Sequence, residues 1–355
     1  MKRSLAIADR AAALSLRLIV AANILFLLSF LLVAFLATGK ARAETPACTG
    51  EDMLTQLRQD DPNLFQSIED QAAATMNGKG LLWKIEKGGA KPSYLFGTMH
   101  MTDPRVTELT PAARSAFEGA DTVVIETTDI LDQQKMMAAI FSQPDLMMFT
   151  DDTTLMSLLT PQDAKTVAEA LDARGIPAGS VSKMKPWMLS AMVALPACEL
   201  ARKNAGVPVL DIKLAKDAEA AGKKLAGLET VLEQLQAMAS LPMEFHMKGL
   251  VETLKLGDKM DDVIETMIVL YEAEETGMFW PLFRAALPSG DEDDAGYADF
   301  EKTMITSRNG VMVTKAEPIL AVGNAFIAVG ALHLPGPDGV IELLRRDGYT
   351  VTPAG

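Results

Sequence analysis

Two histidines stand in the same local pattern, a short apolar run followed by Gly-x-x-His. His100 ends the stretch YLFGTMH and His333 ends IAVGALH, and the whole chain of 355 residues contains three histidines. Histidine is the commonest metal ligand and an acid or base near neutral pH. A repeated setting for two of so few histidines therefore favours a shared chemical site.

The surrounding sequence predicts where these histidines lie. Apolar runs bounded by turn residues predict strands over 81–85, 94–96, 122–125 and 324–329. In an open α/β sheet, ligands bind beyond the carboxyl ends of the strands, where the loops converge. Gly97 and Gly330, each three residues before a histidine, allow a sharp turn or the close approach of another group. We therefore expect both histidines at one edge of a sheet.

Glu126 follows the third predicted strand directly. Because an apolar strand interior does not tolerate an unpaired carboxylate, we expect Glu126 at the same edge. Two imidazoles and one carboxylate form a ligand set with an open position for water, and a cation bound there would acidify that water for hydrolysis. The alternative is that each histidine is an ordinary hydrogen-bonded loop residue. For His246, on a predicted helix, a structural role is the expectation.

The order of the predicted elements indicates an α/β (α+β) fold. Two strands, a helix beginning at Thr110 and a third strand open the domain. From about 131 to 283, helical spacing dominates and predicts a largely helical insertion. A short strand at VPVL, a helix ending at Gly222 and a strand over 224–228 are expected within it. A helix over 297–307, closed by Asn309-Gly310, then precedes the His333 strand, and a helix and a last strand end the single predicted domain, 44–355.

The first 43 residues differ from the rest of the chain. Four basic residues precede an apolar run over 18–37, and Ala-Arg-Ala at 41–43 is a small-residue cleavage pattern. We interpret this segment as a signal peptide. Because the run is long enough to span a bilayer, an N-terminal membrane anchor is the alternative. Both predict an extracytoplasmic protein, periplasmic or secreted, or anchored to the inner membrane, since the basic residues stay inside.

Composition limits the partners and the chemistry. The formal net charge of −14 argues against binding to nucleic acid, which requires a basic surface. Cys48 and Cys198 would lie in a compartment that permits disulfides, so a single bridge and two free thiols are the alternatives. The sequence contains no H-E-x-x-H, G-x-S-x-G or Walker phosphate loop.

Several segments together resemble the TraB/GumN family, which is related to the Tiki metalloproteases of animals. They are YLFGTMHMTDPRV, ADTVVIET, GLETVLEQL, RNGVM and VGALHLPGPDGVIELLRRDGYTV, and the likeness runs from about 81 to 351. The resemblance implies a mixed β-sheet flanked by helices, similar to erythromycin-esterase-like proteins. It also implies a divalent-metal-dependent, peptidase-like activity centred on His100, His333 and Glu126. The likeness to Tiki favours manganese or cobalt, whereas the ligand types alone also admit zinc.

Four further residues are candidates for the site. An Arg-Asn pair of the family matches Arg308 and Asn309, which would bind a substrate carboxylate or oxyanion and hydrogen-bond beside it. The alternative is a helix C-terminus, where Arg complements the dipole and Asn-Gly forms the cap. Asp103 is expected either to orient the first histidine or to form a turn before the next proline. Glu229 is either a site carboxylate or base, or a helix-entry or ion-pair residue.

These features favour a secreted or membrane-anchored metal-dependent hydrolase, a peptidase that acts on a peptide or protein with one divalent cation. The second hypothesis is a non-catalytic protein that captures a peptide or signal molecule. A third, a metal or haem carrier, rests on fold analogy alone.

Overall fold

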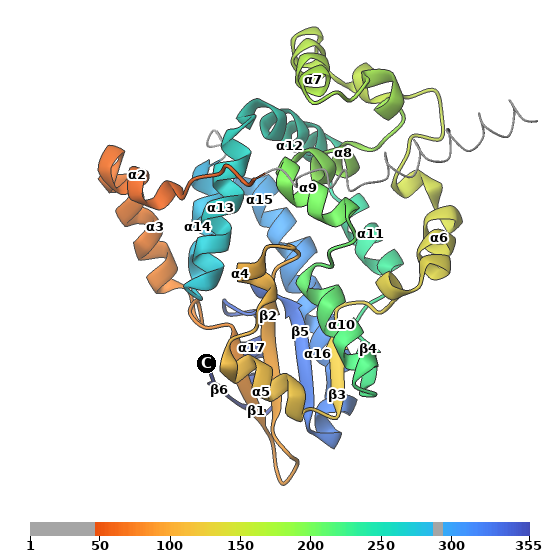
Figure 1. Ribbon diagram of the computed structural model, residues 1–355. Helices are drawn as coiled ribbons and strands as arrows, with labels where there is room; N and C mark the ends of the chain where they lie inside the picture. The colour runs from red at the N-terminus through yellow and green to blue at the C-terminus, as the bar shows by residue number, and fades with distance from the viewer. Residues whose placement is uncertain (1–46, 287–293) are drawn as a thin grey trace, which may run out of the picture. The chain divides into compact units, whose positions relative to one another are not determined.

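A six-stranded sheet flanked by helices organises the chain (Figure 1). The computed structural model describes residues 47–286 and 294–355. The strand order is β4-β3-β5-β2-β1-β6, and the bounds are β1 Leu82–Glu86, β2 Ser93–Thr98, β3 Thr122–Ile125, β4 Lys224–Gly227, β5 Ala325–Gly330 and β6 Thr350–Pro353. Strands β4, β3, β5 and β2 run parallel, whereas β1 is antiparallel to both of its neighbours. The mixed sheet predicted from the sequence is confirmed.

Helices make up most of the remaining chain. Their bounds are α2 Met53–Asp60, α3 Pro62–Ala74, α4 Pro104–Thr107, α5 Pro111–Gly119, α6 Gln133–Ser142, α7 Pro161–Ala173, α8 Pro186–Val193, α9 Ala197–Asn204, α10 Leu210–Ala220, α11 Val231–Ala239, α12 Met243–Leu256, α13 Lys259–Glu272, α14 Phe279–Ala286, α15 Asp294–Glu301, α16 Ser307–Val322 and α17 Val340–Arg346. A π-helical turn, Lys302–Thr306, joins α15 to α16.

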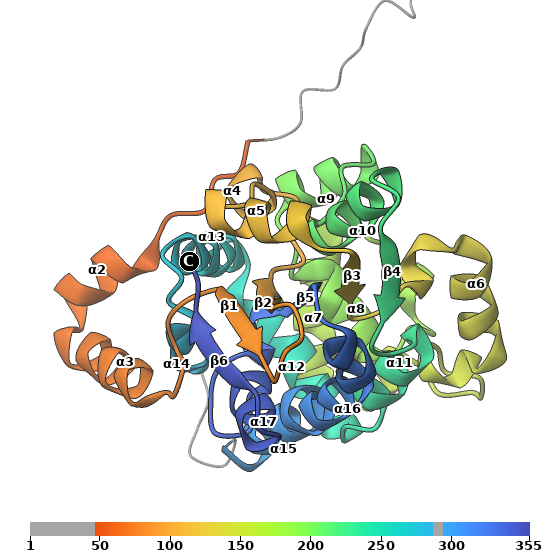
Figure 2. The same ribbon diagram turned by 90° about the horizontal axis from the view of Figure 1, so that it is seen from below.

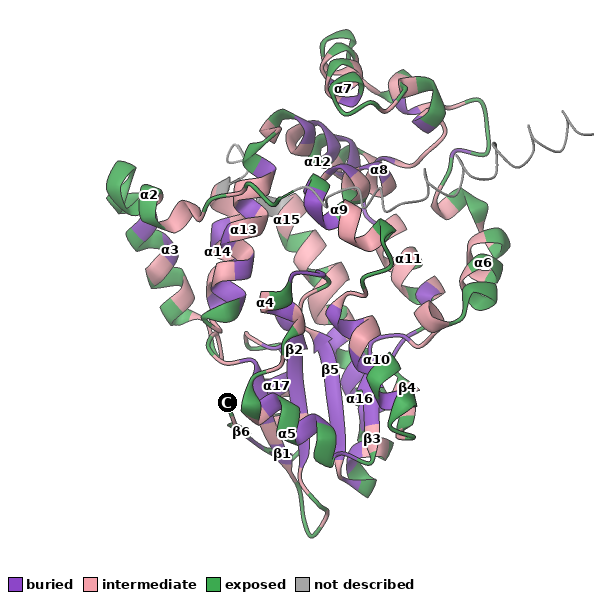
Figure 3. Cartoon of the chain, viewed as in Figure 1, coloured by how far each residue is buried: buried purple, intermediate pink, exposed green. Residues whose placement is uncertain are grey.

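Both faces of the sheet are covered, so its central strands are buried on both sides. Successive side chains of a strand point to opposite faces: Phe96 and its neighbour Ala328 pack toward α5 and α10, while Leu95 and Ile327 pack toward α16 and α17. Figure 2 shows the sheet between these two pairs of helices, and Figure 3 shows the burial of β2 and β5. This burial explains why the strands are continuous apolar runs.

The helical middle of the chain has a core of its own. Leu155, Leu171, Leu189 and Leu250, from η3 (Leu155–Leu158), α7, α8 and α12, are completely buried in one cluster that is separate from the two clusters on the sheet. The predicted largely helical segment over 131–283 is confirmed, with β4 as the strand within it.

Two local predictions are wrong. VPVL forms no strand, because Pro208 cannot donate to a ladder and Leu210 already begins α10. The helix predicted to close at Asn309-Gly310 continues through both residues to Val322. Asn309 is completely buried and its side chain is hydrogen-bonded, which stabilises the helical path over the left-handed cap that the sequence suggested.

The predicted signal or anchor segment, 1–43 with its apolar run over 18–37, lies outside the described residues. Within the described residues, no helix combines the length and the apolar composition needed to cross a bilayer.

A disulfide links Cys48, ahead of α2, to Cys198 in α9, across a sequence separation of 150. Such a bridge stabilises a fold mainly by restricting the unfolded chain. Reduction, or replacement of both cysteines by serine, is expected to lower the free energy of unfolding by about 2–4 kcal/mol. Urea unfolding with and without reductant measures the change, and the double serine variant is the control because reductant should leave it unaffected. An oxidised protein whose intact mass shows two free thiols would contradict the pairing.

Candidate functional site

Four strand ends meet at one edge of the sheet and carry the polar residues of the candidate site. In the parallel register Thr98 of β2 lies opposite Gly330 of β5. His100 follows β2, and His333 ends a short 3-10 turn, Ala331–His333, that follows β5. Glu126 comes directly after β3. Strand β4 pairs with β3, and Glu229 follows shortly after the end of β4.

The two motif glycines are needed for close approach. A Cβ on Gly97 would lie 2.7 Å from Leu334 Cδ1 and 3.2 Å from Ala331 Cα. A Cβ on Gly330 would lie 3.2 Å from Glu126 Oε1, and the Gly330 N–H donates to that oxygen over 2.7 Å. Gly330 therefore allows the backbone after β5 to hold a carboxylate that comes from β3.

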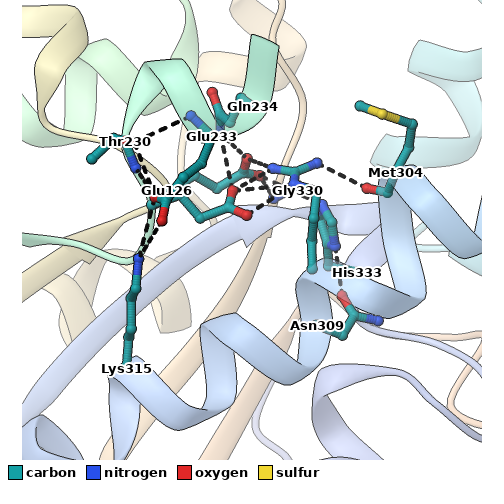
Figure 4. Close-up of polar contacts among 11 residues, drawn as sticks. Glu126, Thr230, Glu233, Gln234, Met304, Asn309, Lys315, Gly330 and His333 are labelled. Atoms are coloured by element: carbon teal, nitrogen blue, oxygen red, sulfur yellow. Dashed lines mark hydrogen bonds and ion pairs between the residues drawn. The ribbon is translucent and has the colours of Figure 1, made fainter. Parts of the chain in front are cut away.

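A buried ionic cluster of Arg308, Glu126 and Glu229 fixes the two glutamates. Figure 4 labels Glu126 with its contacts Gln234 and Gly330. Arg308 Nη2 lies 2.8 Å from Glu126 Oε2 and 2.7 Å from Glu229 Oε2, and Arg308 Nε donates to Glu229 Oε1 over 3.0 Å. Gln234 Nε2 also donates to Glu126 Oε2 over 3.0 Å. The side chains of Arg308, Glu126 and Glu229 are 12%, 8% and 4% exposed, so these charges depend on one another rather than on water.

His333 is held in one tautomer. Its Nδ1 lies 2.6 Å from Asn309 Oδ1, and Asn309 Nδ2 donates to the Asp338 carbonyl over 2.8 Å. Because that carbonyl can only accept, Asn309 must present its oxygen to the ring, and the ring must donate from Nδ1. Nε2 is then the free nitrogen, and it lies 3.9 Å from Glu126 Oε1. Burial lowers the pKa of His333 to about 4, so the ring is neutral at pH 7.

His100 is held in the same way by a different partner. Its Nδ1 lies 2.7 Å from Asp211 Oδ2, which can only accept when ionised, so Nε2 is again left free. The negative charge of Asp211 raises the pKa of His100 to about 9. The His100 side chain is 62% exposed, whereas that of Asp211 is 5% exposed. One ring nitrogen of His100 is thus tied to the protein while the ring itself is open to solvent.

Opposing effects set the charge of Glu126. Burial raises its pKa, but several neighbours together lower it to about 2: His333, which is charged only below its own pKa of about 4, His100, Arg308 and the Gly330 N–H. Glu126 is therefore an ionised carboxylate beside the free nitrogen of His333.

Other predicted residues have local roles. Asp103 caps α4 through the Arg105 N–H and forms an ion pair with the Arg105 side chain over 3.0 Å. Asp103 does not orient His100, because Nδ1 of His100 is bound to Asp211 instead. Asp103 lies in the turn before Pro104, as the other alternative predicted. His246 Nε2 contacts the Met238 carbonyl at 3.0 Å, as expected of a structural histidine.

Arg308 and Asn309 lie in the first turn of α16, so the alternative of a helix C-terminus for this pair is wrong. The π-helical turn comes immediately before them, and the Met304 carbonyl within it accepts from Arg308 Nη1 over 2.9 Å. Such turns inside helices are frequent at functional sites. The turn and helix α16 together aim two consecutive side chains at Glu126 and His333.

Asp211 and Gln234 contact the site residues but are not among the residues predicted from the sequence. Asp211 lies in the first turn of α10, where an acidic residue is usual for a helix start; the wrong strand over VPVL hid this position. Gln234 lies on α11, whose start is fixed by a capping box between Thr230 and Glu233. That Thr-x-x-Glu signature follows Glu229 directly and could have placed both Glu229 and Gln234 beside the helix start.

The donor groups at this edge suit a divalent cation. Two imidazoles, each bound through Nδ1 to an oxygen, leave Nε2 without a protein hydrogen bond, which is the usual arrangement of metal-binding histidines; a cation would displace the proton that His100 Nε2 carries at pH 7. Glu126 supplies an ionised carboxylate. Within residues 47–286 and 294–355, however, no three His, Cys, Asp or Glu side chains already stand together as a ligand group. The chemistry of the donors fits a metal, and their assembly around one is a proposal.

Comparisons with known proteins agree with this picture. Residues 81–353 match the TraB/PrgY/gumN family. The chain is 26% identical to metalloprotease TIKI1 of Xenopus tropicalis, across 82% of this chain and 66% of that protein. It is 27% identical to metalloprotease TIKI1 of Danio rerio, across 77% of this chain and 63% of that protein. The match thus spans under two thirds of each relative. No solved structure matches significantly, so the likeness to erythromycin-esterase-like proteins stays a prediction.

The surroundings of the two histidines predict distinct titrations in the metal-free protein. At pH 7, His100 should be protonated because its pKa is about 9, and His333 should be neutral because its pKa is about 4. Nitrogen NMR of ¹⁵N-histidine protein over a pH series measures both, with each signal assigned from a single His→Ala variant. A neutral His100 at pH 7 would contradict the pairing with Asp211.

The two buried contacts of Arg308 predict that removing this side chain lowers the stability of the fold strongly. Arg308→Ala would leave Glu126 and Glu229 buried without a partner, so we expect the free energy of unfolding to fall by about 3–5 kcal/mol. Lys315→Ala, on the same helix, removes an exposed pair with Glu233 and should cost less than about 1 kcal/mol. Urea unfolding at pH 7 compares the two variants. Equal effects would show that Arg308 does not neutralise the glutamates.

Proposed function

The chain belongs to the TraB/PrgY/gumN family, and from that premise we propose that it is a metal-dependent hydrolase that cleaves peptides or proteins. The names of its relatives, metalloprotease TIKI1 among them, support this class of activity. At about a quarter identity the relatives do not establish the reaction, so the proposal depends on the site itself.

One observation carries the proposal. His100 and His333, which are distant in the sequence, lie at the same sheet edge, and each is bound through Nδ1 to an oxygen acceptor. Neither ring needs its Nε2 for the contacts that hold it. A histidine with only a structural role has no reason to leave the same nitrogen free at two related strand ends.

We assign the cation to His100, His333 and Glu126, with manganese, cobalt or zinc as the candidate metals. When bound, such a cation lowers the pKa of a water molecule and polarises a carbonyl group. The solvent exposure of His100 gives a substrate access to this side of the site. Gly330 holds Glu126 Oε1 through its N–H and so fixes the oxygen that lies nearer to His333.

Arg308 supports this site in a way that differs from the expectation that it binds a substrate anion. Its three side-chain nitrogens already donate to Glu126, Glu229 and the Met304 carbonyl. Arg308 neutralises the two buried carboxylates and binds Oε2 of Glu126. The other oxygen of Glu126, Oε1, lies on the side of His333. Both oxygens of Glu229 accept from Arg308, so the ion-pair alternative describes Glu229 better than a base for water does. Asn309 orients His333.

We also propose that the protein acts outside the cytoplasm, either in the periplasm or secreted, or anchored to the inner membrane through residues 18–37. The disulfide between Cys48 and Cys198 supports this location, because such bonds persist in oxidising compartments. The acidic net charge of −14 agrees with a peptide or protein partner rather than nucleic acid.

The proposal predicts a specific dependence on the two site histidines. Purified wild-type protein supplied with manganese, cobalt or zinc should retain about one metal per chain and shorten a peptide library, and chelation should stop cleavage until one cation is restored. His100→Ala and His333→Ala should lose both properties while remaining folded. His246→Gln, away from the sheet edge, is the matched control and should keep both.

Elemental analysis and mass spectrometry of the peptides measure these outcomes. A wild-type protein that holds no metal under any supply would contradict the proposal. Peptides that are retained uncut by the metal-loaded protein would instead favour the capture of a peptide or signal molecule.

A further inference from the structure

Asp211 is a buried carboxylate that contacts the site from the start of α10. It is 4% exposed. Its Oδ1 accepts from Thr98 Oγ1 over 2.7 Å and its Oδ2 lies 2.7 Å from His100 Nδ1. Thr98 ends β2 and His100 lies in the turn that follows it. The side chain of Asp211 therefore joins α10 to the end of β2 and to the turn that carries His100.

The charge of Asp211 is balanced differently from that of other buried acids. Among the described residues, the other buried carboxylates are each paired with arginine or lysine: Asp103, Glu126, Glu199 and Glu229. The ion-pair partner of Asp211 is the imidazole of His100. The N-terminus of α10 offsets part of its charge, and the rest is balanced by the ring of His100, which lies 2.7 Å away. Among these buried acids, Asp211 is therefore the one that is balanced by a candidate ligand of the site rather than by arginine or lysine.

The two site histidines differ in how firmly the fold holds them. The His333 side chain is 4% exposed, so packing and the amide of Asn309 suffice to fix its ring. The His100 side chain is 62% exposed, and packing restricts it far less. Its orientation therefore depends on the bond to Asp211.

We propose that Asp211 is a positioning residue for His100: it fixes the ring through Nδ1, aims Nε2 at the site and strengthens that nitrogen as a ligand for a divalent cation. This inference rests on the proposed function, because it assumes that Nε2 of His100 is used. It also assigns a role to a residue that the sequence motifs do not include. A carboxylate on the second nitrogen makes imidazole a better donor than a neutral amide does.

A purely structural role is the alternative, in which Asp211 only pins α10 to β2 through Thr98. Three variants separate the two roles. Asp211→Asn removes the charge, Thr98→Val removes the hydroxyl contact but leaves Asp211 beside His100, and Asp217→Asn removes an exposed acid of the same helix that pairs with Lys213. Affinity for manganese, cobalt and zinc is measured by calorimetry on the full chain, and the midpoint of urea unfolding is recorded for each variant.

Asp211→Asn is expected to bind the cation about 10- to 100-fold more weakly than wild type. Thr98→Val should lower the unfolding midpoint but change the affinity by less than threefold, and Asp217→Asn should match wild type in both. An unchanged affinity in Asp211→Asn, or an equal loss in Thr98→Val, would overturn the proposal. If Asp211→Asn does not fold, Asp211→Glu keeps the charge but displaces it, and an unchanged affinity in that variant would overturn the proposal as well.

A second measurement separates failure of this inference from failure of the proposed function. In metal-free protein at one fixed pH, the ¹⁵N shift of His100 Nδ1 should be that of a protonated nitrogen, and it should move in Asp211→Asn but not in Asp217→Asn. If wild type binds no cation, the proposed function fails, and with it the positioning role, whatever the shift. If wild type binds a cation but Nδ1 is unprotonated, the proposed function stands and the role of Asp211 is overturned.

Discussion

The parallel pairing of β2 with β5 is the constraint on which the rest of the site depends. It places Thr98 opposite Gly330, so the turns that carry His100 and His333 leave the sheet side by side. The pairing of β3 with β5 adds Glu126 at the same edge. Glycine at positions 97 and 330 is what allows this packing, since a Cβ at either would press on Leu334 or on Glu126.

Charge balance at this edge determines much of the surrounding structure. Glu126 and Glu229 lie at the ends of adjacent strands and are both buried, so a cation must lie between them. Arg308 meets this need from α16, and the π-helical turn before it helps to aim the side chain. The same helix turn delivers Asn309 to His333. One short segment therefore fixes a carboxylate and an imidazole together, which links the stability of the fold to the orientation of the site.

Much of this arrangement follows from the sequence because it depends on short-range patterns. Apolar runs predicted the strands, and strand ends placed His100, Glu126 and His333 at one edge. What the sequence did not predict depends on contacts between distant segments. Asp211 meets His100 across more than a hundred positions, and its own surroundings are those of an ordinary helix start. Asn309-Gly310 looked like a helix end, but the burial and bonding of Asn309 keep the helix intact.

We infer that a divalent cation binds between Nε2 of His100, Nε2 of His333 and the carboxylate of Glu126. Crystals grown with manganese or cobalt and measured on either side of the absorption edge of that metal test it most directly. We expect one anomalous peak per chain, in contact with Nε2 of both histidines and with a carboxylate oxygen of Glu126. An anomalous map without a peak at this edge of the sheet, from protein saturated with metal, would contradict it.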